Sequence, residues 1–136
     1  MTIDDCKSIV GEYALPIAQV LGLGGWCLSF SYDDDGENYG TAQIAPDQQW
    51  AGINIDPDMH SNKAEVLDTI LHELLHVVHA PLEQFRHQVN EHTKGAAREI
   101  FVTLGTTASE QLVAAWLGIL TQVLGLTPAK LARKAQ

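Results

Sequence analysis

Apolar residues recur along this chain with two different spacings, which predict its helices and strands. From Ile3 to Leu21 they follow a helical period, and Pro16 is expected to kink or divide that helix before the glycines of 22–25 end it. Apolar and polar residues then alternate, as in strands, in three shorter runs: Trp26–Tyr32, Tyr39–Ala45 and Gln49–Asp56. The N-terminal half therefore predicts one helix followed by three strands.

The second half of the chain predicts helices. Asn62 and Glu65 have the spacing of a helix-capping pair, and Pro81 ends the pattern that they begin. Between them runs an apolar stripe at helical spacing: Val66, Leu67, Ile70, Leu71, Leu74, Leu75 and Val78. After a polar stretch from Glu83 to Lys94, two further helices are predicted, Gly95–Leu104 and about Ala108–Val123.

This order of elements predicts an α+β domain with an N-terminal helix, a small antiparallel sheet of about three strands and C-terminal helices. The sheet is expected to pack on the helix that begins at Asn62. The chain has 136 residues, which suits one domain. We place this domain at 1–126, followed by a short basic tail at 127–136 with Lys130, Arg133 and Lys134.

The acidic segment Asp33–Asn38 is expected to be a solvated hairpin loop. Its aspartates suggest a calcium site of the EF-hand type. However, Ala42 stands where such a loop needs a bidentate glutamate. Turn residues of this composition are typical of a loop between two strands.

Charge and composition exclude several classes of function. The formal net charge is −9 at pH 7, and a nucleic-acid-binding surface needs the opposite sign. No run approaches the roughly 20 apolar residues of a membrane span, and the acidic start lacks the features of a signal peptide. The cysteines, Cys6 and Cys27, form no disulfide framework. We therefore expect a cytoplasmic protein without nucleic-acid or membrane partners.

The apolar helix contains the motif His72-Glu73-Leu74-Leu75-His76. Positions i and i+4 lie on one face of a helix, so both imidazoles can bind one zinc ion. Glu73 would then lie close enough to take a proton from a water molecule on the metal. Two histidines and a glutamate in a buried helix would be destabilising without such a role.

A catalytic zinc site needs a third protein ligand, and four side chains are candidates. His79 lies seven residues beyond His72, about 10 Å along a straight helix, which is too far for one ion. His87 and His92 lie in the polar stretch, where histidines are commonly exposed. We favour Glu110, because an amphipathic helix packed across the motif helix can direct a glutamate toward it.

Glu110 and one further acidic residue also have simpler interpretations. The segment Thr107-Ala108-Ser109-Glu110 matches a capping box, in which Glu110 would only bond to the Thr107 backbone. Asp68 precedes His72 by four residues and could orient its imidazole, but we favour an exposed helical acid at this position. Both alternatives remain open from the sequence.

The motif and its surroundings resemble a known group of proteins. The segments that carry the resemblance are Leu67–His76, Ala80–Glu83 and Ser109–Val113, and the upstream strand region from Trp26 through Pro57 also matches. They resemble small zincin-type proteins of phages and prophages, which are similar to a minimal gluzincin domain. Together these segments extend over nearly the whole chain.

The resemblance implies zinc bound by His72, His76 and Glu110, with Glu73 as general base. It predicts a zinc-dependent metallopeptidase that hydrolyses peptide bonds in a peptide or protein substrate, in the host cytoplasm if a phage encodes it. The substrate is expected to add as a strand beside an exposed sheet edge, for which we choose Gln49–Asp56.

The chain also departs from the larger gluzincins. Those enzymes carry an acidic residue four positions after the glutamate ligand, where this chain has Ala114. They also use a histidine or tyrosine from a second subdomain to stabilise the oxyanion, and this chain predicts no second subdomain. The alternative function is therefore a zinc-binding structural or regulatory phage protein with weak or no catalysis.

Overall fold

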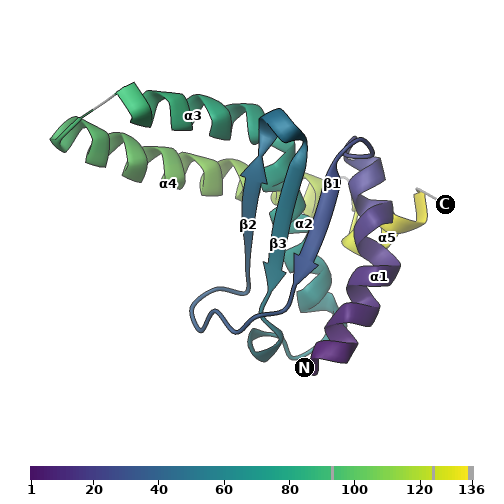
Figure 1. Cartoon of the computed structure of the whole chain (residues 1–136). Coiled ribbons are helices and arrows are strands. Elements are labelled where there is room, and N and C mark those ends of the chain that lie inside the picture. Colours follow the sequence, from purple (N-terminus) through teal and green to yellow (C-terminus); the bar gives the residue numbers. More distant parts are fainter. Residues whose placement is uncertain (93, 124, 135–136) are drawn as a thin grey trace.

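The N-terminal helix begins a structure in which one sheet and several helices surround the motif helix (Figure 1). This computed structural model describes residues 1–92, 94–123 and 125–134. Helix α1 (Ile3–Val20) is capped by Thr2, the residue before it, whose side chain accepts a hydrogen bond from the Asp5 backbone in a capping box. Pro16 lies inside α1 and does not divide it.

Three strands form at the predicted places: β1 (Cys27–Ser31), β2 (Gly40–Ala45) and β3 (Trp50–Ile55). Their order in the sheet is β1-β3-β2, and β3 runs antiparallel to β2 but parallel to β1. The prediction of an antiparallel sheet is therefore wrong, and the sheet is mixed. Its central strand, β3, buries every second residue against the helices: Ala51, Ile53 and Ile55.

The loop between β1 and β2 passes over the end of β3. It does not close a hairpin, as the sequence predicted, because β3 lies between the two strands that it joins. Two side chains at the end of β3 bind the loop instead. Asn54 Oδ1 accepts a hydrogen bond from the Asp33 backbone (2.8 Å), and Asp56 Oδ2 accepts one from the Asp35 backbone (3.0 Å). The carboxylates of the loop remain exposed.

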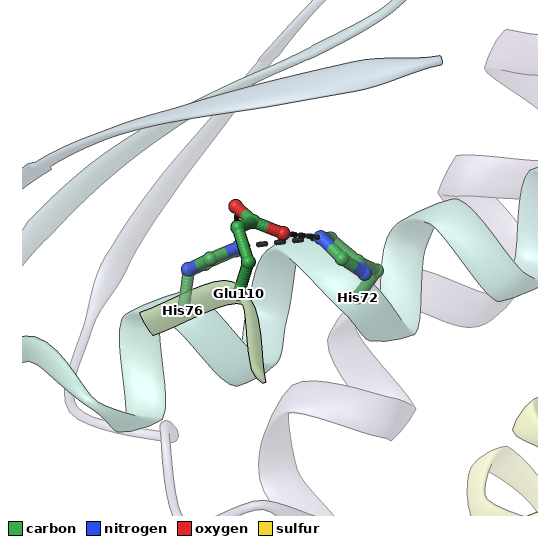
Figure 2. A group of neighbouring side chains, drawn as sticks. All are labelled: His72, His76 and Glu110. Carbon is green, nitrogen blue, oxygen red and sulfur yellow. Dashed lines mark hydrogen bonds and ion pairs between the residues drawn. The ribbon is translucent and has the colours of Figure 1, made fainter. Parts of the chain in front are cut away.

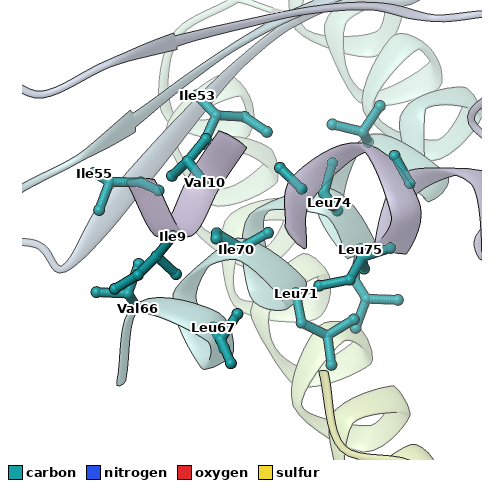
Figure 3. Packing of buried hydrophobic residues seen from close by; sticks show 14 of the residues in the cluster. Ile9, Val10, Ile53, Ile55, Val66, Leu67, Ile70, Leu71, Leu74 and Leu75 are labelled. Carbon is teal, nitrogen blue, oxygen red and sulfur yellow. The ribbon is translucent and has the colours of Figure 1, made fainter. Parts of the chain in front are cut away.

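Helix α2 (Lys63–Val78) carries the motif and forms the centre of the core. Its predicted start is confirmed, because the Asn62 side chain accepts a hydrogen bond from the Glu65 backbone (3.1 Å). The predicted apolar stripe is buried in the core from Val66 to Leu75, but its last member, Val78, is exposed at the end of the helix. Figure 3 shows these α2 side chains beside Ile9 and Val10 of α1 and Ile53 and Ile55 of β3.

The polar stretch after α2 is also helical. Helix α3 (Ala80–His92) starts directly after α2 and is followed by α4 (Ala96–Gly118). Figure 1 shows α3 and α4 side by side, extending away from the sheet. Gly95 precedes α4 with a φ of 65°, a left-handed conformation that glycine adopts without strain where the chain reverses.

Two of the predicted helices merge in α4. The sequence predicted a break between Leu104 and Ala108, and Gly105 in this interval lowers helix stability by about 1 kcal/mol relative to alanine. In the structure α4 continues through that position, packed against both α2 and α3. Tertiary packing thus outweighs local propensity here. A π-helical turn (Ile119–Val123) follows the helix.

The C-terminal segment forms helix α5 (Pro128–Lys134), where the sequence predicted a basic tail. This helix packs against α1, and Ala132 is buried in the core. Ala129 also packs against the core cluster, and burial of these small apolar side chains stabilises the helix on the core. Among the helices that the structure describes, none has the length and apolar character to cross a membrane.

Asp56 is a buried acidic residue that joins the end of β3, the loop between β1 and β2, and the short turn Pro57–Met59 that precedes α2. Its carboxylate accepts hydrogen bonds from the backbone of Asp35 (3.0 Å), Gly36 (3.2 Å) and Asp58 (2.9 Å). Burial acts to raise the pKa of this carboxyl, but the backbone N–H donors outweigh it and hold the pKa below its usual 3.8. The ionised form therefore stabilises the fold.

We predict that Asp56→Asn lowers the free energy of unfolding by about 2 kcal/mol near pH 7, because the amide satisfies these donors poorly. With the folded-state pKa below 3.8, this contribution is complete above that pH and declines as the pH falls toward the folded-state value. Urea unfolding should thus show a smaller difference between variant and parent at about pH 3 than at about pH 7. The exposed Asp34→Asn is the control, and an equal loss there would contradict the prediction.

Candidate metal centre

Helix α2 places the two motif histidines one turn apart on the side of the helix that faces α4. Their Nε2 atoms are 3.2 Å apart. Glu110 of α4 reaches both rings, with Oε1 3.1 Å from His76 Nε2 and Oε2 3.3 Å from His72 Nε2 (Figure 2). Two segments more than thirty residues apart in sequence thus meet at one point.

The three side chains have the chemistry and the spacing of a metal site. Among the described residues they form a group whose possible ligand atoms all lie within 4.8 Å of one another. Tetrahedral zinc, with bonds of about 2.0–2.2 Å, holds its ligand atoms roughly 3.4 Å apart. The measured separations of 3.1–3.3 Å are close to that value. Two imidazoles and a carboxylate could therefore hold one cation without rearrangement of the backbone.

The surroundings of the group leave one side open. The side chain of His76 is 12% exposed, that of His72 is 31% exposed and that of Glu110 is 54% exposed. Three protein ligands with an open position are typical of catalytic metal sites, whereas structural zinc sites close with four protein ligands.

The capping interpretation of Glu110 is wrong. Helix α4 is continuous through Thr107, so Glu110 lies inside the helix and not in its first turn. The backbone groups that a capping box would satisfy are already inside the helix at this position. Its carboxylate instead faces His72 and His76.

The other candidate ligands lie elsewhere. His79 is the C-cap residue of α2, and His92 is an exposed residue in the last turn of α3; neither belongs to the group of three. His87 is part of α3, but its side chain lies outside the part of the chain that the structure describes. Asp68 lines the cavity beside the group, where partial burial raises the pKa of its carboxyl.

Glu73 is the buried carboxylate of the site. It is 5% exposed and lines the same cavity as the two histidines. Burial raises its pKa to about 7, and the negative charge of Glu110 adds to this shift. A carboxylate with such a pKa can accept and release a proton near neutrality, as general bases do.

Two residues near the site were not found from the sequence. Ser109 is buried beside His76, and its Oγ lies 3.3 Å from His76 Nδ1. In the tautomer that carries its proton on Nδ1, the ring donates to this hydroxyl, which orients it and leaves the Nε2 lone pair available to a metal ion. The only sequence signal for Ser109 was its position next to Glu110.

The second residue is Gly40, at the start of β2. A Cβ atom there would lie 2.6 Å from Thr69 Cγ2, 3.0 Å from the Asn54 carbonyl oxygen and 3.3 Å from Glu73 Cγ. Only glycine lets the strand approach α2 this closely. Gly40 therefore sets the distance between β2 and the buried glutamate, and no local sequence pattern indicated it.

A cavity of about 1330 Å³ lies over the site. Residues of β2, α2, α3 and α4 line it, with Glu73 and the group of three side chains among them. The cavity is of the size that accommodates small ligands or a short segment of polypeptide. Its position brings an edge strand of the sheet beside the candidate metal ligands.

Comparison with known proteins found no match: no family model, curated protein or solved structure matches this chain.

We predict that Gly40→Ala destabilises the fold by about 1–3 kcal/mol, because the added methyl group must displace Thr69 or β2. Thermal or urea unfolding measures this effect. Gly11→Ala in α1 is the matched control, since a Cβ there meets nothing within 4 Å and should stabilise the helix by about 0.5–1 kcal/mol. A neutral or stabilising effect at both glycines would contradict the close packing of β2 on α2.

Proposed function

We propose that this protein is a zinc-dependent metallopeptidase in which His72, His76 and Glu110 bind the metal. The observation that supports this proposal is the meeting of these three side chains beside the buried Glu73. The motif spacing, the open position of the site and the resemblance to zincin-type proteins of phages agree with it. A zinc ion bound there would lower the pKa of a water molecule and polarise a substrate carbonyl.

The protein's own residues then have distinct roles. Glu73 accepts the proton of the attacking water and passes it to the leaving amine. Its burial raises its pKa to about 7, which suits both transfers near neutral pH. Ser109 orients the His76 ring through Nδ1. Gly40 allows β2 to lie against Glu73, which keeps the carboxylate next to the cavity.

The sheet edge at which we place the substrate differs from the one chosen from the sequence. The sequence suggested Gln49–Asp56 as the exposed edge, but β3 is the central strand and both of its edges are paired. Strand β2 is an edge strand, and its residues line the cavity. We therefore propose that an extended peptide adds beside β2, whose outer backbone groups are the ones that such peptides pair with.

A second function is supported by a different observation. Large apolar side chains are exposed on α3 and α4: Leu82, Phe85, Ile100, Val102 and Leu104. Such exposure is typical of surfaces that bind another protein. A zinc-binding structural or regulatory protein of a phage, with weak or no catalysis, would use this surface and retain the metal for stability.

We predict that the parent protein, after removal of metal with a chelator, binds one equivalent of zinc. Glu110→Ala should weaken zinc binding by more than about 100-fold. Removal of a residue that only orients a ligand costs up to about 100-fold in metal affinity, and removal of a ligand itself should cost more. Competition titration with a chromogenic zinc chelator measures the affinity.

The matched control for this prediction is His92→Ala, an exposed residue outside the group of three. Its zinc affinity should equal that of the parent. If Glu110→Ala binds zinc normally and His92→Ala does not, the third ligand is the histidine and our assignment is wrong.

We predict that Glu73→Gln retains zinc but reduces peptide hydrolysis by about 10²–10⁴-fold, because the amide cannot accept the water proton. Mass spectrometry of a peptide library after incubation measures cleavage, and the exposed Glu12→Gln serves as control. Equal cleavage by the Glu73 variant and the parent would disprove the role of Glu73 as base. Absence of cleavage by the zinc-loaded parent itself would favour the binding function.

A further inference from the structure

The cavity over the candidate metal site is strongly acidic. Besides Glu73 and Glu110, five carboxylates line it: Glu37, Asp47, Glu65, Asp68 and Glu91. Among the described residues that line it there is no lysine or arginine. The Glu65 carboxylate already accepts hydrogen bonds from Ser61 and Asn62. Glu37, Asp47 and Asp68, together with Glu73 and Glu110, still carry more negative charge than one zinc ion would neutralise, which suggests a further cationic group in the bound ligand.

The buried carboxylate of Glu73 is a separate indication of a ligand. Its side chain is almost wholly enclosed and lies at the cavity wall. Within the part of the chain that the structure describes, this carboxylate makes no hydrogen bond or ion pair. Since buried carboxylates are normally paired, this side chain is placed to meet a group that enters the cavity.

Acidic residues lie beyond both ends of β2, although the strand itself contains none. Glu37 precedes the strand, Asp47 follows it, and Glu91 faces the cavity from α3. A six-residue strand extends about 20 Å, so negative charge lies on both sides of the candidate metal site. A cleft lined by one sign of charge concentrates the field and attracts ligands of the opposite sign.

We propose that this cavity binds a basic segment of polypeptide, with lysine or arginine side chains on both sides of the bond to be cleaved. The inference rests on the proposed peptidase function and names its substrate class. The cationic side chains pair with Glu37 at one end of β2 and with Asp47 at the other. Peptides rich in aspartate or glutamate are repelled by the same residues.

Three fluorescent peptides of equal length test the proposal, differing only in whether lysine, glutamine or glutamate flanks the central residues. Binding is measured by fluorescence anisotropy on the zinc-loaded Glu73→Gln variant, which should not cleave them. The lysine peptide should bind at least about tenfold more tightly than the glutamate peptide, and added salt should reduce this difference. Equal affinity for all three peptides would overturn the proposal.

A charge-matched pair of variants separates the cavity from the general acidity of the protein. Glu37→Gln combined with Asp47→Asn removes two negative charges at the ends of β2, and Asp4→Asn combined with Glu12→Gln removes two on α1, which does not line the cavity. The first pair should weaken binding of the lysine peptide by about fivefold, and the second should change it by less than twofold. Equal effects would show non-specific attraction and overturn the proposal.

The cleavage assay of the parent protein distinguishes this inference from the peptidase function. If the lysine peptide binds selectively but none of the three is cleaved, the basic-segment site stands and the peptidase proposal fails. If all three are cleaved at equal rates, the peptidase proposal stands and the charge preference is overturned. Cleavage of the lysine peptide with the highest kcat/KM supports both.

Discussion

The packing of one face of α2 against α1 and the sheet is the constraint on which the rest of this structure depends. Val66, Ile70 and Leu74 are fully buried, which fixes the rotation of the helix about its axis. His72 and His76 must then lie on the opposite side, facing α4 and the cavity. Loss of this apolar contact would destabilise the core, and His72 and His76 would no longer be held facing α4.

Helix α4 supplies the other half of the site, Glu110, and two buried residues near Glu110 in sequence hold this part of the helix against the protein. Ser109 and Val113 are buried against the rest of the protein, and Glu110 lies between them in sequence, with its carboxylate at the histidines. Glu73 and Glu110 bring two carboxylates toward one cavity, and the charge of Glu110 adds to burial in raising the pKa of Glu73. A bound cation would relieve this repulsion, which is the electrostatic reason for proposing a metal here. The same excess of carboxylates is the basis for proposing a basic substrate.

Much of the secondary structure was predictable because its signals are local. The capping residue Asn62, the apolar stripe of α2 and the alternation in β3 each depend on residues close together in the chain. The errors concern contacts between distant segments. Strand β3 lies between β1 and β2, where Asn54 and Asp56 hold the connecting loop, and α4 continues through Gly105 while it packs on α2 and α3. Neither interaction leaves a periodic pattern near the residues that it affects.

The sequence by itself determined that His72 and His76 share one face of a helix with Glu73 beside them, since the helical period alone sets that spacing. It also made Glu110 a candidate without deciding among the alternatives. Only the tertiary structure decided that Glu110 reaches both histidines, that Ser109 lies beside His76, and that a glycine at position 40 admits β2 to the site. The physical reason is that these contacts depend on how separate elements pack, and packing is set by the whole core and not by any one segment.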